Sequence, residues 1–194
     1  KKLEFLNRNT IAQKKVTIKG IIPFTSSFLK GKSIQKQSKN SILIFDVQPR
    51  KKHTYCTLAP TVDFYSEENT ISFLECIDEL ANSFNLKVHI KRKRHSDNIS
   101  KRYLKKIDFF VKNSNWYDLD PGIDANYACK ILDPVAAISA PFTSTAIISK
   151  ENNIPSIYFD PTGILDKDFK INNGIQLIST KKELYKWFES IELE

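Results

Sequence analysis

Three consecutive hydroxyl side chains, Thr143, Ser144 and Thr145, stand between a predicted buried strand and a predicted helix. The strand is the apolar run 135–138, which Ser139 follows. The first backbone N–H groups of a helix are unpaired and carry the positive end of its dipole, so hydroxyls beside them add donors to an anion site. The pattern predicts a phosphate site at these four side chains. The alternative is that Thr143 or Ser144 only caps the helix.

A basic run from Lys91 to His95 follows another predicted strand, 86–90. The carboxyl ends of parallel strands meet at one edge of a sheet, so Lys91, Lys93 and Arg94 are expected at the same edge as the hydroxyls. Arginine makes bidentate phosphate contacts and lysine supplies a point charge, which suits a pyrophosphate or a nucleoside monophosphate. The alternative is a solvated basic loop.

Candidates for acid–base chemistry lie near the ends of two further predicted strands. Asp46 and His53 fall near the carboxyl end of the first strand and are the local candidates for a catalytic base. Asp46 has the alternative role of fixing the turn at Gln48. Asp160 ends the strand 156–159, where it either holds a ligand hydroxyl or makes a turn.

Asp118 and Asp120 form an Asp-x-Asp pattern, in which two carboxylates can hold a divalent cation. The same spacing recurs at Asp166 and Asp168, so the pattern carries little information in this chain. We interpret Asp120 as part of a strand-to-helix turn beside a nucleotide base or ribose. The 3 histidines and 3 cysteines do not cluster as zinc ligands do. We therefore expect no metal and no cofactor.

Several segments resemble the bacterial polysaccharide biosynthesis PFTS-motif proteins. The segment 140–146 reads Ala-Pro-Phe-Thr-Ser-Thr-Ala, and 155–161 reads Pro-Ser-Ile-Tyr-Phe-Asp-Pro, which together match the signature of that family. Upstream, 45–49 resembles its Phe-Asp-Val-x-Pro segment, and 89–94 resembles its Ile-Lys-Pro-Lys-Arg segment, with Arg92 where the family usually has proline.

The resemblance covers roughly residues 16–165 by motif order. It implies a fold like the C-terminal nucleotide-binding half of GT-B glycosyltransferases, and sugar transfer from a UDP- or CMP-linked donor to a glycan or lipid-linked acceptor. GT-B enzymes generally do not need an Asp-x-Asp metal. Their catalytic base often lies on the other domain, which this chain does not provide by our interpretation.

These residues must be positioned by an α/β domain in which strands and helices alternate. The apolar patterns predict strands at 42–47, 86–90, 116–119, 135–138, 156–159 and 175–178. They predict helices at 67–84, 98–111, 124–132 and 146–152, and a last helix from 181. Single helices between strands favour a Rossmann-like, doubly wound parallel sheet.

We expect this nucleotide-sugar-binding domain to span residues 41–194. Residues 1–40 are basic and polar, and we interpret them as an N-terminal extension, a hinge or a remnant of a preceding domain. The chain has no methionine, so we expect it to be a trimmed fragment. Its 194 residues, 41% of them hydrophobic and 27% charged, have the composition of one globular domain.

The sequence contains no apolar run of membrane-spanning length and no signal-peptide core. The 3 cysteines are odd in number and widely spaced, which favours a reducing compartment. We therefore expect a cytoplasmic protein, with contact at the inner face of an anionic membrane where a lipid-linked acceptor would lie.

The net charge of +8 leaves a basic nucleic-acid-binding domain as an alternative function. Against nucleic acid as a partner, the sequence has no recognisable nucleic-acid module and no basic stripe interleaved with aromatic residues. A non-catalytic interaction domain is the other alternative. Thermal stabilisation by UDP, CMP, GDP or a short duplex separates these readings, because a ligand that binds only the folded state stabilises it.

Overall fold

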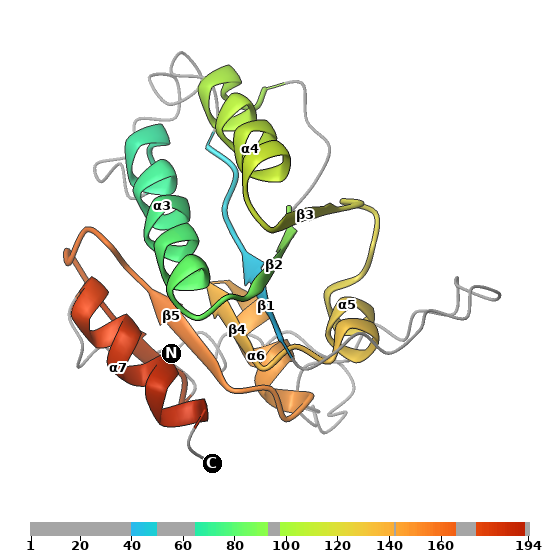
Figure 1. Ribbon diagram of the computed structural model, residues 1–194, viewed down its shortest axis with the longest axis vertical. Coiled ribbons are helices and arrows are strands. Elements are labelled where there is room, and N and C mark those ends of the chain that lie inside the picture. Colours follow the sequence, from blue (N-terminus) through green and yellow to red (C-terminus); the bar gives the residue numbers. More distant parts are fainter. Residues whose placement is uncertain (1–39, 50–64, 93–97, 142, 166–173, 193–194) are drawn as a thin grey trace, which may run out of the picture.

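The computed structural model describes residues 40–49, 65–92, 98–141, 143–165 and 174–192, and the account below concerns these residues (Figure 1). Six parallel strands form one sheet in the order β3-β2-β1-β4-β5-β6. The strands are β1 (Ser41–Phe45), β2 (Lys87–Lys91), β3 (Trp116–Leu119), β4 (Ala136–Ser139), β5 (Ser156–Phe159) and β6 (Gln176–Ile178). The helices of the described part are α3 (Glu67–Ser83), α4 (Lys101–Asn113), α5 (Ala125–Leu132), α6 (Ser144–Glu151) and α7 (Lys181–Glu192).

The parallel, doubly wound sheet that the sequence predicts is confirmed. All six predicted strands are present, and all but one of their bounds agree to within one residue. The first strand is the exception, because β1 ends at Phe45 and not at Val47. Two helices also differ. α6 begins at Ser144, two residues before the predicted start, and α4 spans Lys101–Asn113 where the sequence predicts 98–111. The segment 1–39 lies outside the described residues.

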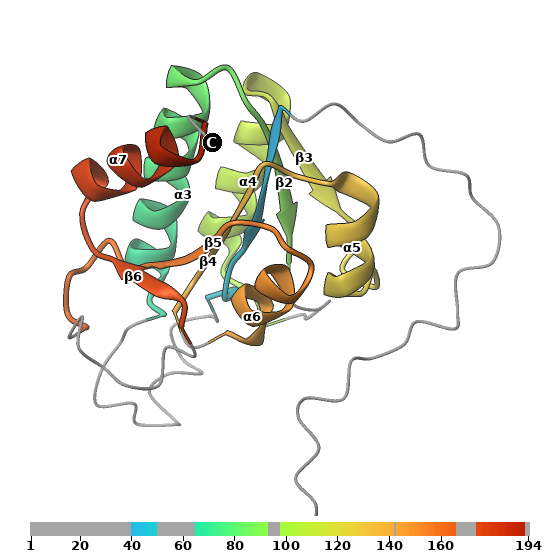
Figure 2. The same ribbon diagram turned by 90° about the horizontal axis from the view of Figure 1, so that it is seen from below.

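Two helical layers enclose the sheet (Figure 1 and Figure 2). On one face α3, α4 and α7 pack against alternate apolar residues of the strands, among them Ile44, Ile90 and Phe159. On the other face α5 and α6 pack against the intervening residues, among them Phe45 and Ala137. A central strand such as β1 is therefore buried along its whole length, which explains its unbroken apolar sequence.

The strand order reverses between β1 and β4. From β1 the chain moves outward to β2 and β3, then returns to place β4 on the other side of β1 and continues to β5 and β6. The backbone N–H of Ala140 donates to the carbonyl of Phe45 at 2.8 Å and ties the two strand ends together. In open α/β sheets, ligands bind outside the carboxyl ends of the strands at such a reversal.

Candidate functional site

The hydroxyl residues of the reversal point form a connected cluster at the start of α6. Thr145 Oγ1 lies 3.1 Å from Ser139 Oγ and 2.9 Å from Thr143 Oγ1. Thr143 is the N-cap residue of α6, but its hydroxyl donates to the carbonyl of Ala140 at 2.8 Å. Ser144 is exposed at the first position of the helix.

The N-terminus of α6 has no side-chain cap, unlike those of the other four described helices. Ser66, Ser100, Asp124 and Thr180 each accept a hydrogen bond from a backbone N–H in the first turn of α3, α4, α5 and α7. At α6 no cap side chain takes this role. The hydroxyls therefore do not act as an ordinary cap, and the first-turn N–H groups of α6 remain available to an anion.

Lys91 lies at the same carboxyl edge, two strands away from Ser139. The sheet register aligns Lys91 with Phe45 and Phe45 with Ser139, so all three side chains leave the same face. The Cα atoms of Lys91 and Ser139 are thus about 10 Å apart, at about 4.8 Å for each strand spacing. Phe45 lies between the cation and the hydroxyl cluster.

The ammonium group of Lys91 is held in place by backbone carbonyls. Nζ donates to the carbonyl of Arg92 at 2.7 Å and to that of Pro121 at 3.0 Å. Burial lowers the pKa of Lys91, while the carboxylates of Asp124, Asp120 and Asp46 act in the opposite direction. Lys93, Arg94 and His53 lie outside the described residues.

Arg92 and Asp118 form a bidentate ion pair beside the basic run. Arg92 Nε donates to Oδ1 at 2.9 Å and Nη2 to Oδ2 at 2.6 Å. Asp120 accepts from the backbone N–H of Gly122 at 2.8 Å, as a turn residue does. Within the described ranges no group of three or more His, Cys, Asp or Glu side chains is placed to hold a metal.

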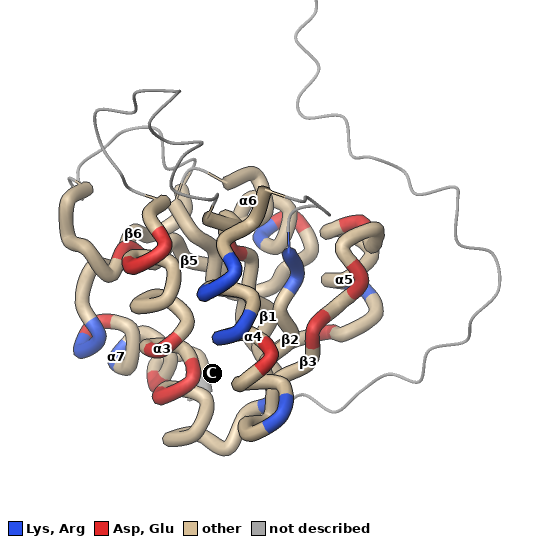
Figure 3. Tube along the Cα trace, turned by 90° about the horizontal axis from the view of Figure 1, so that it is seen from above, with Lys and Arg blue, Asp and Glu red and all other residues tan. Residues whose placement is uncertain are grey.

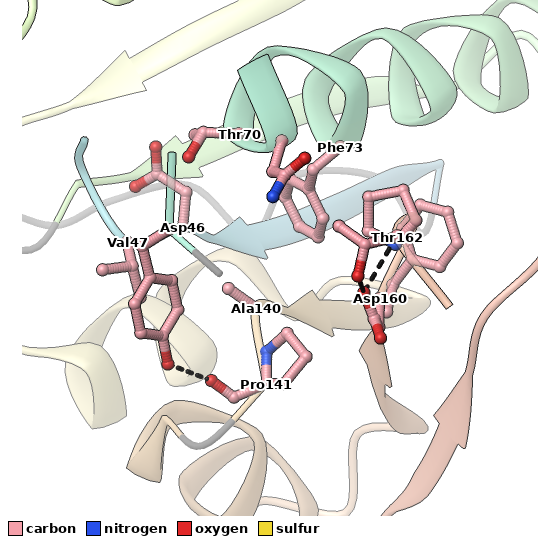
Figure 4. Close-up of a pocket in the computed structure, with 12 residues that line it drawn as sticks. Asp46, Val47, Thr70, Phe73, Ala140, Pro141, Asp160 and Thr162 are labelled. Atoms are coloured by element: carbon pink, nitrogen blue, oxygen red, sulfur yellow. Dashed lines mark hydrogen bonds between the residues drawn. The ribbon is translucent and has the colours of Figure 1, made fainter. Parts of the chain in front are cut away.

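A pocket opens on the α3 side of the reversal point (Figure 4). It lies among the carboxyl ends of β1, β4 and β5 and the first turns of α3, and neither Lys91 nor the hydroxyl cluster lines it. Figure 4 shows Asp46 and Thr70 on one side of this pocket and Asp160 and Thr162 on the other. The residues that line it are Asp46, Val47, Tyr65, Asn69, Thr70, Phe73, Ala140, Pro141, Phe159, Asp160, Pro161 and Thr162.

Asp46 is the most perturbed group at this pocket. Its side chain is almost completely buried, and the hydroxyl of Tyr103 on α4 donates to Oδ2. Oδ1 has no hydrogen-bond partner among the described residues. Burial raises the pKa of the Asp46 carboxyl from 3.8 to about 6, and the Tyr103 hydrogen bond and the charge of Arg92 offset part of this effect.

Asp160 is buried, and both of its carboxylate oxygens accept hydrogen bonds from its own loop. One carboxylate oxygen accepts from the backbone N–H and the hydroxyl of Thr162, and the other accepts from the backbone N–H of Leu165 at 3.0 Å. This is the turn role that the sequence left open beside the ligand role. The carboxylate holds the loop 160–165 in a fixed conformation at the rim of the pocket.

Part of the positive charge of the sequence is balanced locally. Arg102 and Lys106 of α4 form ion pairs with Glu67, Glu68 and Glu75 of α3. Figure 3 shows acidic positions on α3 and basic positions on α4. Two basic residues of α4 are therefore paired with carboxylates of α3, although α4 itself carries five basic residues and one acidic residue.

Sequence reasoning missed two partners in this site. It assigned Tyr103 to the apolar stripe of its helix, although the phenol serves the carboxylate of Asp46. It included Arg92 in the basic run and noted it as a departure from a family pattern, but it did not pair Arg92 with Asp118. The aromatic residue in a basic helix and the paired Asp-x-Asp were visible signals, but neither pattern names its partner.

Comparison with known proteins gives three results. No curated protein matches this sequence. The crystal structure of Methanocaldococcus jannaschii UDP-GlcNAc 2-epimerase in complex with UDP-GlcNAc and UDP is similar, with a TM-score of 0.48 and 15% identity over 79% of this chain. The similar region is 39% of the epimerase chain, so this chain spans less than half of that protein.

A helix that could cross a membrane is not found among the described residues.

The profile of the polysaccharide biosynthesis PFTS motif proteins matches residues 1–188, nearly the whole sequence. The match includes the hydroxyl cluster, the buried Asp46 and the basic run. The chain therefore belongs to the family of polysaccharide biosynthesis PFTS motif proteins.

Proposed function

We propose that residues 41–194 are the donor-binding domain of a GT-B-type glycosyltransferase in bacterial surface polysaccharide biosynthesis. The donor is a UDP- or CMP-linked sugar whose phosphate lies at the N-terminus of α6. The observation that carries this proposal is the hydroxyl-lined helix start, which no side chain caps and which lies at the reversal of the strand order. Membership of a polysaccharide biosynthesis family supports it.

The helix start would contribute chemistry as well as binding. In sugar transfer, a hydroxyl of the acceptor attacks the anomeric carbon, a new C–O bond forms, and the C–O bond to the donor phosphate breaks. Negative charge then grows on the departing phosphate, where backbone N–H groups and the helix dipole stabilise it in the transition state. Lys91 would add positive charge from the neighbouring part of the edge.

A base must take the proton of the acceptor hydroxyl. Among the described residues Asp46 is the candidate, because a carboxyl with a pKa of about 6 is ionised near neutral pH and is still basic enough to accept a proton. His53 is the second candidate from the sequence. The acceptor, a glycan or a lipid-linked sugar, would approach from the cytoplasmic face of an anionic membrane, and no metal or cofactor takes part in this scheme.

Calorimetric titration tests the proposal directly. UDP, CMP, GDP and a short DNA duplex are titrated into this chain and into the full-length protein. We expect weak binding of UDP or CMP to this chain, tighter binding to the full-length protein and no sugar transfer by this chain alone, because GT-B sites lie between two domains. If neither protein binds UDP or CMP at millimolar concentration, the proposal is wrong. Binding of the duplex alone would favour the nucleic-acid alternative.

A further inference from the structure

The pocket beside Asp46 adjoins the proposed phosphate site through a short piece of backbone. Ala140 and Pro141 line the pocket, and the carbonyl of Ala140 accepts the hydroxyl of Thr143, the N-cap residue of α6. Ala140 therefore connects the start of α6 with the pocket. The lining of the pocket indicates what kind of ligand group it would accept.

The lining of the pocket is acidic. Asp46 and Asp160 contribute buried carboxyl groups, and none of the described lining residues is Lys, Arg or His. The guanidinium of Arg92 acts on Asp46 electrostatically, but both of its bonded nitrogens serve Asp118. An anionic group in this pocket would meet like charges with little water between them, which is strongly unfavourable.

The pocket also lacks a hydrogen-bond donor for one of its own atoms. The hydroxyl of Tyr65 donates to the carbonyl of Pro141 at 2.8 Å, and that of Thr70 donates to the carbonyl of Ser66 at 2.9 Å. Asp160 is satisfied by its own loop. Asp46 Oδ1 is buried and has no partner in the described part of the chain. A buried acceptor without a partner is costly, and a hydroxyl or amide N–H of a ligand would relieve this cost.

Apolar surface completes the pocket. The rings of Phe73 and Phe159 lie with their centroids 5.8 Å apart, tilted by 34°, and the ring of Pro141 borders the same space. Binding sites for small molecules combine apolar walls of this kind with a few polar groups that fix orientation. Such walls suit the C–H faces of a pyranose ring, whose hydroxyls point outward.

We infer that this pocket holds the sugar of the donor and selects an uncharged sugar, a neutral hexose or N-acetylhexosamine, with Asp46 accepting a hydrogen bond from one of its hydroxyl or amide groups. Sugars that carry a carboxylate are excluded, both uronic acids and the acidic sugars that CMP carries. This inference rests on the proposed function and narrows it, since it favours UDP-linked neutral donors over CMP-linked acidic ones. It assigns the remaining oxygen of Asp46 to the donor sugar, so the role of base falls to the second candidate, His53.

The decisive comparison uses UDP-glucose and UDP-glucuronic acid, which differ only at C6, where a hydroxymethyl group is replaced by a carboxylate. Calorimetric titration of UDP, UDP-glucose and UDP-glucuronic acid is performed with the full-length protein. We expect UDP-glucose to bind more tightly than UDP, and UDP-glucuronic acid to bind at least tenfold more weakly than UDP-glucose. CMP and CMP-sialic acid form a second pair, in which the acidic sugar should give no gain over CMP.

Asp46→Asn tests the residue assignment. Asparagine has nearly the same shape, and its amide oxygen still accepts the Tyr103 hydroxyl, but it carries no charge. The variant should bind UDP like the wild type and reduce the discrimination against UDP-glucuronic acid to about threefold or less. Asp108→Asn is the matched control, since Asp108 is exposed on α4 and does not line the pocket.

Each outcome decides a separate point. Failure of every nucleotide to bind contradicts the proposed function. Binding of UDP with equal or tighter binding of UDP-glucuronic acid, or a clear gain from CMP to CMP-sialic acid, leaves the proposed function intact and overturns the inference. If Asp46→Asn discriminates against UDP-glucuronic acid as strongly as the wild type does, Asp46 takes no part in selecting the sugar. If thermal melting shows that Asp46→Asn is unfolded, the wild-type comparison of the paired ligands still decides the sugar class.

Discussion

Tyr103 of α4 donates its hydroxyl to Asp46 at the end of β1, and both side chains are almost completely buried. This hydrogen bond joins the helical layer to the carboxyl edge of the sheet, where the candidate site lies. It fixes Oδ2 of the carboxylate and leaves Oδ1 without a partner among the described residues. A buried, incompletely satisfied carboxylate lowers stability, and such groups concentrate at functional sites.

The first prediction concerns the pH dependence of stability. The pKa of Asp46 is 3.8 in the unfolded reference and about 6 in the folded protein, so the folded state holds the proton more tightly. The contribution of protonated Asp46 to the free energy of unfolding is therefore complete below about pH 4 and is lost as the pH rises through about 6. The loss amounts to at most about 3 kcal/mol, at 1.36 kcal/mol for each pKa unit.

Asp46→Asn should remove this part of the pH dependence. The free energy of unfolding of variant and wild type is measured by urea titration at pH 4 and pH 7.5. The variant should gain stability relative to the wild type between these pH values, by up to about 3 kcal/mol. A constant difference between the two proteins would mean that the folded state does not raise the pKa of Asp46.

The second prediction is that Tyr103→Phe destabilises the protein more at neutral than at acid pH. The substitution keeps the ring but leaves both oxygens of a buried carboxylate without a donor, which costs roughly 1–3 kcal/mol or more when the group is charged. The cost is smaller when Asp46 is protonated, because the carboxyl group is then uncharged. Urea titrations at pH 4 and pH 7.5 measure the difference. Tyr117→Phe is the control, because Tyr117 is half-exposed and its hydroxyl donates to the nearby Asn115.

Much of the fold is predictable from the sequence because it depends on patterns among residues that are close together in the chain. The unbroken apolar run of β1, the caps Ser66 and Asp124 and the apolar stripes of the helices each depend on residues close in sequence. The order of the strands does not. Apolar periodicity says that a strand is buried but not which strand lies beside it, so the position of β1 between β2 and β4 comes only from the structure.

The same limit applies to the site. The sequence correctly places the ends of β2 and β4 at one edge, but side chains alternate between the two faces of a sheet. Asp46 therefore borders the α3 side, whereas Lys91 and Ser139 leave the opposite face with Phe45 between them. Asp160 reaches the pocket from the loop after β5 and not through this alternation. The partner of Asp46 is 57 residues away in the chain, beyond the reach of any local pattern.

The third prediction concerns the hydroxyls of α6. Thr143→Ala combined with Ser144→Ala should weaken binding of UDP or CMP about tenfold and should not abolish it, because each hydroxyl contributes roughly 0.5–1.5 kcal/mol net. The backbone N–H groups and the helix dipole remain in the variant. Calorimetric titration measures the change, with Ser190→Ala on the exposed side of α7 as the control. Loss of all measurable binding in a folded variant would contradict a site built mainly from backbone groups.

The fourth prediction is that the contribution of Lys91 to nucleotide binding depends on salt. The strand spacing places Lys91 about 10 Å from Ser139 at the start of the phosphate site. Two unit charges at that separation interact by about 1.7 kcal/mol when the effective dielectric constant is about 20. At 0.1 M salt the screening length is about 10 Å. Lys91→Met should therefore weaken UDP or CMP binding about five- to tenfold at 10 mM salt and about twofold or less at 0.5 M salt.

Lys87→Met provides the matched control, because Lys87 lies on the same strand and the same face, at the end of β2 away from the site. Four residues of a strand span about 13 Å, so its charge should contribute little. Calorimetric titrations at both salt concentrations, with thermal melting to verify folding, complete the test. Lys91→Met also leaves the carbonyl of Pro121 without its donor. An equal loss of affinity at both salt concentrations would therefore assign Lys91 to positioning the Pro121 loop and not to attracting the phosphate.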